Sequence, residues 1–433
     1  NTVVVSQGLN SEVFVKLPDG TYNPPPGSSA RLIKNADGSY TYETLNRAQL
    51  VFNSPTASTA PGRLASYTLK SGVQAKFSYT GNDLTKVENS LGRSLTFSHS
   101  GGRISSVTDG NARSVSYGYD TSNNLTQFTD ATTQSTSFEY DLPGRMTKIF
   151  YPSAPTNAFM VNVYDTLGRV KTQSNANGKL YTYYFAGSRS EEAGPLGVNN
   201  VSYLDGQGHV LRAIDPLGKV TSNTYDGAGR LAKTVLPEGN SVEYSYDDAP
   251  CAASDKRCTH NVKTVVQRPK PGSPLAALTS SFTYESSFNK VLTSTNARGK
   301  ITDFSYHPAH GEINTITAPA DAAGNRPQTT HAYTSYTAAG FANFYLPTGQ
   351  TRKINATATV TDTTSYNASN KYVPATSVVD SGGLNLTSTF TYDAVGNLQA
   401  VDGPRSDVSD TASFIYDKER RLLQTTNALG KLS

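Results

Sequence analysis

The sequence contains little of the material from which compact enzymes and membrane proteins are built. Its 433 residues include no tryptophan, two methionines, two cysteines and six histidines, and hydrophobic residues make up only 36% of the chain. No stretch has the length and apolar periodicity of a good helix, and none approaches the roughly 20 apolar residues of a transmembrane span. This composition is typical of a half-exposed β-sheet rather than of a compact α/β enzyme.

Catalytic and cofactor motifs are missing as well. The sequence has no Gly-x-Ser-x-Gly elbow, no phosphate-binding loop and no His-Glu-x-x-His metal motif. His307, His310 and Glu312 could supply three metal ligands, but they stand where a turn is expected, so a degenerate turn is the favoured interpretation. The net charge is only +4, and no basic run is interleaved with aromatic residues, which argues against nucleic-acid binding. We therefore predict no catalytic residue, no metal and no cofactor.

The chain has a recurring turn instead. Residues 140–145, 164–169 and 225–230 read Tyr-Asp-x-x-Gly-Arg, and weaker copies begin at Tyr119, Tyr392 and Tyr416. Between them stands a second turn of the form Asx-x-x-Gly-basic, at residues 89–93, 175–179, 215–219, 296–300 and 427–431. From Asp165 to Asn175 the step is ten residues, which leaves roughly six residues for each strand. A repeat of this kind predicts an all-β fold of consecutive antiparallel hairpins.

The residue types of the turn have a physical reason. An Asp or Asn side chain accepts a hydrogen bond from a backbone N–H two residues on, and Gly supplies the left-handed conformation that closes the hairpin. We expect Gly168 and Gly229 to have positive φ, and the basic residue that follows to point to solvent, so that Arg230 tolerates substitution. The residues singled out as structural turn residues, and not as catalytic groups, are Asp141, Gly144, Arg145, Asp165, Gly168, Arg169, Asp215, Gly218, Asp226, Gly229, Arg230, Asp393 and Gly396.

Aromatic residues enter these turns in pairs at spacing two, such as Phe138 with Tyr140 and Phe304 with Tyr306. Spacing two places both rings on one face of a strand, so stacked hairpins would build a ladder of rings. The ladder is predicted to contain Tyr119, Tyr140, Tyr246, Tyr284, Tyr306, Tyr392 and Tyr416. Packing between hairpins is the favoured role, and a glycan-binding face is the alternative.

The texture of the sequence divides the chain into four segments. Residues 1–70 are a β-rich lead-in, 71–248 carry clear repeats, 249–280 form an insertion with prolines and both cysteines, and 281–433 resume the repeats, irregularly at 307–388. Cys251 and Cys258 lie close together in a polar loop, where a local disulfide is favoured over free thiols or a metal, and a disulfide indicates export. The numbered chain is expected to be a section of something longer.

The alternating turns resemble the YD repeats of the Rhs family over about residues 71–433. The resemblance implies a long sheet that spirals into a hollow shell. In bacterial polymorphic toxins and insecticidal toxin complexes such a shell encloses a C-terminal effector segment, and in teneurins a similar shell serves cell–cell adhesion. The Pro- and Gly-rich capping segment of the toxin members does not follow Gly430.

These observations together predict a non-enzymatic scaffold. The chain would be a section of an exported bacterial shell, secreted or at the cell surface, that encapsulates or presents a C-terminal effector polypeptide outside this chain. The alternative is a surface adhesin or glycan-binding module that uses the aromatic face to contact a cell-surface glycan or protein. An enzyme acting on polysaccharide is a distant third, because no close pair of carboxylates stands apart from the turn residues.

Overall fold

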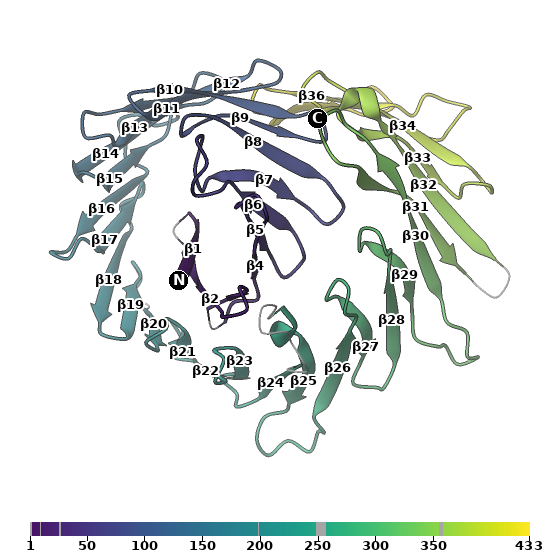
Figure 1. The fold of residues 1–433 in the computed structure, drawn as a ribbon, viewed down its shortest axis with the longest axis horizontal. Helices are drawn as coiled ribbons and strands as arrows, with labels where there is room; N and C mark the ends of the chain where they lie inside the picture. The colour runs from purple at the N-terminus through teal and green to yellow at the C-terminus, as the bar shows by residue number, and fades with distance from the viewer. Residues whose placement is uncertain (1, 9, 26, 198, 248–256, 355–357) are drawn as a thin grey trace.

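The fold is a single long spiral of hairpins (Figure 1). The computed structural model describes residues 2–8, 10–25, 27–197, 199–247, 257–354 and 358–433. Within them the chain forms 37 β-strands and two short 3₁₀ turns, η1 (Arg257–His260) and η2 (Ala368–Asn370), with no α-helix. No helix in this described part is long and apolar enough to cross a membrane. The predicted all-β fold of consecutive antiparallel hairpins is confirmed.

A small sheet precedes the spiral and contains three strands: β1 (Thr2–Gln7), β2 (Asn10–Lys16) and β3 (Tyr22–Asn23). The remaining 34 strands form one sheet. They are β4 (Arg31–Lys34), β5 (Tyr40–Glu43), β6 (Gln49–Phe52), β7 (Leu64–Thr68), β8 (Gln74–Thr80), β9 (Asp83–Asn89), β10 (Ser94–Ser100), β11 (Arg103–Asp109), β12 (Ser114–Tyr119), β13 (Leu125–Thr129), β14 (Ser135–Leu142), β15 (Arg145–Phe150), β16 (Met160–Tyr164), β17 (Val170–Asn175), β18 (Leu180–Ala186), β19 (Arg189–Ala193), β20 (Asn199–Leu204), β21 (Val210–Ile214), β22 (Val220–Tyr225), β23 (Leu231–Val235), β24 (Ser241–Tyr246), β25 (Val262–Arg268), β26 (Leu278–Tyr284), β27 (Val291–Thr295), β28 (Ile301–Tyr306), β29 (Ile313–Thr317), β30 (Gln328–Tyr336), β31 (Phe344–Lys353), β32 (Thr359–Asn367), β33 (Val373–Val379), β34 (Leu386–Tyr392), β35 (Leu398–Asp402), β36 (Ala412–Tyr416) and β37 (Leu422–Thr426).

The long sheet is an open spiral rather than a closed barrel. Each strand from β4 to β37 pairs antiparallel with the next along the chain, beginning with β4–β5 and ending with β36–β37. No ladder among the described residues joins β37 back to β4. In Figure 1 the chain starts near the centre, winds outward through β13–β29, and its last strands come round to the region of β8–β12.

Successive turns of such a sheet alternate between its two edges. We call rim A the edge that carries the tyrosine turns, for example residues 120–124, 165–169, 226–230 and 393–397. Rim B is the opposite edge, with the turn at residues 69–73 and the Asx turns at residues 89–93, 109–113, 175–179 and 215–219.

Rim B of the first winding rests on rim A of a later winding, along a line that we call the seam. The Tyr345 N–H donates to the Ser71 carbonyl at 2.8 Å. Further along, the Arg93 guanidinium donates to the Lys371 carbonyl at 3.2 Å across 278 residues of sequence. The seam ends where the Ala131 N–H donates to the Glu419 carboxylate at 2.7 Å. The spiral is therefore closed edge on edge by contacts between turns.

A β-bulge at rim A gives the sheet its curvature. The register shifts between Gly118 and Tyr119, so that Tyr119 pairs with Leu125 and Thr126 is the extra residue of the following strand. The same shift precedes Tyr246, Tyr306 and other turn tyrosines. A bulge bends its strand and increases the local twist, so a bulge repeated at one edge curls the whole sheet.

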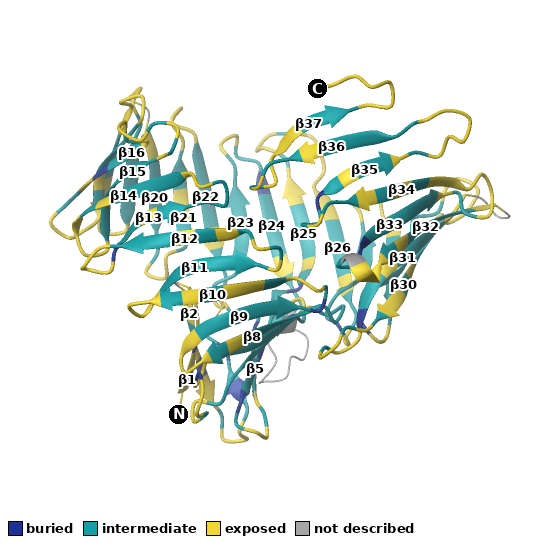
Figure 2. Cartoon of the chain, turned by 90° about the horizontal axis from the view of Figure 1, so that it is seen from above, coloured by how far each residue is buried: buried dark blue, intermediate teal, exposed yellow. Residues whose placement is uncertain are grey.

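The wound sheet keeps both of its faces accessible. The chain exposes 24,595 Å², whereas a compact monomer of the same mass exposes about 16,000 Å². Most strand residues are accordingly of intermediate burial, as Figure 2 shows. This excess area is what a hollow wall one sheet thick requires.

A hydrophobic core cluster of described residues lies at the start of the spiral. The small sheet packs on β4–β6 through Val5, Phe14, Leu32 and Tyr42, with Phe14 fully buried. The Tyr42 hydroxyl donates to the Glu12 carboxylate at 2.7 Å. Residues 31–70 thus belong to the long sheet, which continues without a break in the ladder from β7 to β8. The longest strands, β30–β32, lie within the region expected to be irregular.

Candidate functional site: the turns and the seam

Each tyrosine turn is organised by its aspartate. The Asp165 carboxylate accepts hydrogen bonds at one oxygen from the N–H groups of Leu167 and Arg169, both at 2.9 Å. The Gly168 N–H donates to the Asp165 carbonyl at 3.0 Å, and Gly168 has φ +76°. The Arg169 N–H bond lowers the pKa of Asp165 below its usual value, so the carboxylate stays ionised at neutral pH.

The other candidate turn residues lie in the same setting, with one exception. Asp215, Asp226 and Asp393 each accept two backbone N–H bonds within their own turns. Gly218, Gly229 and Gly396 have φ between +75° and +83°. The exception is the turn at residues 140–145, where Nε and Nη2 of Arg145 each donate to the Asp141 carboxylate at 2.7 Å and strand pairing runs to the tip.

The tyrosines tie each hairpin to the one before it. The Tyr246 hydroxyl donates to the Leu231 carbonyl at 2.8 Å, 15 residues earlier in the chain. The same bond, also over 15 residues, is made by Tyr119, Tyr140 and Tyr306 to Ile104, Leu125 and Val291. Tyr284 makes it to Val262, 22 residues earlier. Tyr392 and Tyr416 occupy the equivalent position beside a bulge. All seven rings are half-buried, and the hydroxyl bonds favour a packing role for these tyrosines over a glycan-binding role.

Sequence reasoning missed this hydroxyl bond, although a signal was present. A tyrosine stands 15 residues after an apolar residue that begins the preceding strand, as with Leu125 and Tyr140. Burial raises the pKa of the hydroxyls of Tyr140 and Tyr246, so they remain protonated donors.

The expectation that Arg230 points to solvent is wrong. Its Nε donates to the Asp226 carboxylate at 2.7 Å, its side chain is 10% exposed, and it lies over the Tyr246 ring at 4.4 Å. It also donates to the Thr259 carbonyl. The planar guanidinium contacts the turn aspartate, the tyrosine ring and a carbonyl of a neighbouring loop at the same time. A basic residue that only began a solvent-exposed strand would make none of these contacts.

Replacing Arg230 with alanine is therefore expected to lower the free energy of unfolding by about 2–4 kcal/mol, because charge-assisted hydrogen bonds and a ring contact are lost. Urea denaturation monitored by circular dichroism measures this. Arg169→Ala is the matched control: Arg169 makes the same bond to its turn aspartate but its side chain is 44% exposed. A control that costs as much as Arg230→Ala would contradict the argument.

Gly72 lies against the backbone of a later winding at the seam. This residue has φ +86°, and a Cβ atom there would lie 2.4 Å from the Asn343 carbonyl oxygen and 2.9 Å from the Phe344 Cα. Phe344 is fully buried and packs edge-on against Tyr372 at 5.0 Å between ring centroids. The seam thus has a tightly packed aromatic centre that only a glycine can approach.

The histidine cluster lies beside this centre. His307 and His310 stack at 4.1 Å, and His310 also contacts the Tyr345 ring at 4.3 Å. The Glu312 N–H donates to His310 Nδ1 at 3.2 Å, so the proton of the neutral ring sits on Nε2. That buried nitrogen has no hydrogen-bond partner in the described part of the chain. Burial and the nearby His307 lower the pKa of His310 from 6.5 to about 4.

The sequence hypothesis of a turn at these residues fits this arrangement, in which the Gly311 N–H donates to the His307 carbonyl. Within the described residues no group of three or more His, Cys, Asp or Glu side chains is placed to hold a metal ion. The candidate disulfide to Cys258 is not tested, because Cys251 lies outside the described residues.

With this geometry in view, comparison with known proteins identifies the family. A model of the teneurin YD-shell family matches residues 91–432. The chain belongs to the teneurin YD-shell family. The resemblance read from the sequence is thus confirmed.

Solved structures are similar to this YD-shell chain at low identity. One is a crystal structure of TcdB2-TccC3 with Cdc42, at 14% identity and a TM-score of 0.39, and the match covers 96% of this chain and 30% of that one. Another is a crystal structure of TcdB2-TccC3 without the hypervariable C-terminal region, at 14% identity and a TM-score of 0.41, and the match covers 95% of this chain and 26% of that one. A third is the Photorhabdus luminescens Tc holotoxin pore, at 10% identity and a TM-score of 0.40, and the match covers 98% of this chain and 30% of that one. The chain spans about a third or less of the length of these structures. No curated protein matches it.

Proposed function

We propose that this chain forms part of the wall of an exported bacterial shell that encloses or presents another polypeptide. The observation that supports the proposal best is the seam: one continuous sheet winds past its own beginning and closes turn on turn. A wall of this kind separates an interior from solvent and leaves the interior unfilled by the chain itself. The large exposed area of the chain supports this arrangement.

The role is structural rather than catalytic. The polar groups that recur in the chain are used in its own turns: the aspartates accept backbone N–H bonds, the tyrosines donate to carbonyls, and Arg145, Arg169 and Arg230 pair with turn aspartates. The same groups cannot also activate a substrate without opening the turns they hold. Shell structure is what the YD-shell family supports for this chain.

The enclosed or attached partner would be a C-terminal effector polypeptide outside residues 1–433, and the shell would work in a secreted form or at the cell surface. The names of the crystal structures join TcdB2 and TccC3 in one structure, and we infer that this chain likewise works together with another polypeptide.

Protease protection of the full-length protein tests the proposal. With its natural flanking sequence, the native protein treated with proteinase K is expected to keep a polypeptide outside residues 1–433 intact. Gly72→Val, which obstructs the seam, should expose that polypeptide to digestion, whereas Gly178→Val, on a free turn of rim B with nothing within 4 Å of its Cβ, should not. Equal digestion of the flanking polypeptide in the native protein and in both variants would overturn the enclosing role.

A further inference from the structure

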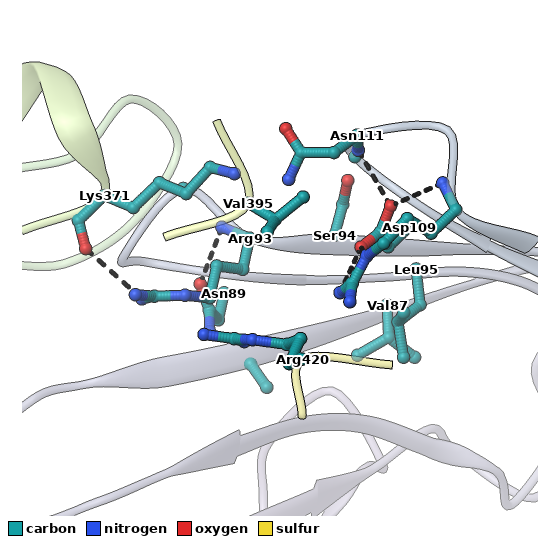
Figure 3. A pocket seen from close by; sticks show the side chains of 14 residues that line it. Val87, Asn89, Arg93, Ser94, Leu95, Asp109, Asn111, Lys371, Val395 and Arg420 are labelled. Carbon is teal, nitrogen blue, oxygen red and sulfur yellow. Dashed lines mark hydrogen bonds and ion pairs between the residues drawn. The ribbon is translucent and has the colours of Figure 1, made fainter. Parts of the chain in front are cut away.

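A cavity of about 470 Å³ lies in the seam (Figure 3). One wall comes from the rim B turns at residues 89–93 and 109–113, and the other from rim A residues Lys371, Val395 and Arg420. The volume falls in the range of roughly 300–1,000 Å³ that small-molecule sites occupy. Any ligand in this cavity would touch both windings at once.

The lining is strongly cationic. It contains Arg93, Arg113, Arg420 and Lys371 against a single carboxylate, Asp109. That carboxylate is already committed to Arg113, whose Nε donates to it at 2.8 Å. Arg93, Arg420 and Lys371 therefore lie in the cavity wall without an ion pair to any carboxylate in the described part of the chain. Like charges held together in a partly enclosed space repel more strongly than they do in bulk water.

The three cations are held by neutral acceptors. Arg93 donates to the Lys371 carbonyl at 3.2 Å and Arg420 to the Asn397 side-chain oxygen at 2.5 Å, while Lys371 Nζ donates to the Ala394 carbonyl at 3.3 Å. Arg93 lacks a carboxylate partner in its own turn because of the residue with which that turn begins. Arg230 has Asp226 at the head of its turn, but the turn of Arg93 begins with the uncharged Asn89.

Two of these cations also occupy strained backbone positions. Arg420 has φ 65° and Lys371 has φ 56°, in the left-handed region that costs a side chain free energy. Arg420 is the fourth residue of its turn, where Gly168, Gly229 and Gly396 stand in other copies. Glycine would relieve the strain there, whereas arginine instead carries a guanidinium into the seam.

We propose that the seam cavity binds a small polyanion bearing two or more phosphate groups, which bridges the two windings. Guanidinium groups recognise phosphate oxygens through paired N–H donors, and the ammonium of Lys371 adds a point charge. A ligand that binds only the closed seam stabilises the closed shell by mass action. The wall would then be fastened by an ionic ligand, at a site separate from any polypeptide that the shell encloses.

Tripolyphosphate is the probe for the test, measured on the whole chain by isothermal titration calorimetry and by thermal unfolding. We expect one site per chain, and a melting temperature raised by several degrees above that in sodium chloride of equal ionic strength, which controls for screening. Arg93→Gln and Lys371→Gln should each weaken binding at least 10-fold. An equal shift in chloride, or no measurable site, would overturn the proposal.

Arg420→Gly separates binding from folding. It relieves the positive φ while removing a guanidinium, so the variant should fold and yet bind tripolyphosphate at least 10-fold more weakly. Thr133→Gly is the matched control, because Thr133 holds the same fourth position of a turn at φ 71° but carries no charge. Unchanged binding in Arg420→Gly, or an equal loss in Thr133→Gly, would contradict the assignment.

Discussion

Gly72→Val should lower the free energy of unfolding by about 2–6 kcal/mol. A β-branched residue at φ +86° is strained by about 1–3 kcal/mol, and forcing its side chain into a packed contact costs about 1–3 kcal/mol more. The contact is unavoidable because the new Cβ would meet backbone atoms of Asn343 and Phe344 at 2.4 and 2.9 Å. Urea denaturation followed by circular dichroism measures the change.

The control for this prediction is Gly178→Val. Gly178 has φ +70° and nothing within 4 Å of its Cβ position, so the substitution costs only the backbone strain. The difference between the two variants isolates the contribution of the seam. If both lowered the free energy of unfolding equally, the seam would not contribute to stability.

Acid should weaken the shell through His310. Its folded-state pKa of about 4 lies below the unfolded value of 6.5, so the unfolded chain binds the proton first as pH falls. The contribution of the neutral His310 to the free energy of unfolding is fully present above pH 6.5 and is lost between pH 6.5 and about 4. The loss is about 3 kcal/mol at most. The surroundings explain the direction: Lys290, Lys70 and His307 all disfavour a positive charge there, and the Tyr333 and Tyr345 rings bury it.

His310→Phe provides the test, since phenylalanine keeps an aromatic ring against Tyr345 without a titrating nitrogen. The free energy of unfolding of the native chain, measured at pH 7.5 and pH 4, should fall by about 3 kcal/mol more than that of the variant. Equal losses in the two proteins would show that other groups carry the acid sensitivity.

The local architecture could be predicted from the sequence because the repeat is itself local. Asp165 and Gly168 lie within one turn, and their hydrogen bonds depend on the backbone geometry of four or five residues. The ten-residue spacing likewise fixes strands and hairpins. The bulge at Tyr119 could not be predicted from the sequence. One unpaired residue in the next strand leaves the pattern of polar and apolar residues almost unchanged.

The seam could not be predicted, because it joins residues nearly 300 positions apart. Arg93 and Arg420 look in the sequence like solvated basic residues after ordinary turns. Their roles depend on which later turn arrives opposite them, and that is set by the accumulated twist and curvature of some twenty strands. The burial of Arg230 also depends on a residue outside its own turn, because Thr259 lies 29 residues further along the chain.

The two ranges of contact in this wall imply an order of events during synthesis. Tyrosine hydroxyl bonds such as that of Tyr246 reach back 15 residues, so each hairpin can dock on its predecessor as soon as it leaves the ribosome. Contacts of low sequence separation form fast, and those of high separation form late. The Arg93–Lys371 contact has to wait for 278 further residues. A growing chain would therefore coil from its N-terminus as an open ribbon, and its seam would close only when the last turns arrive.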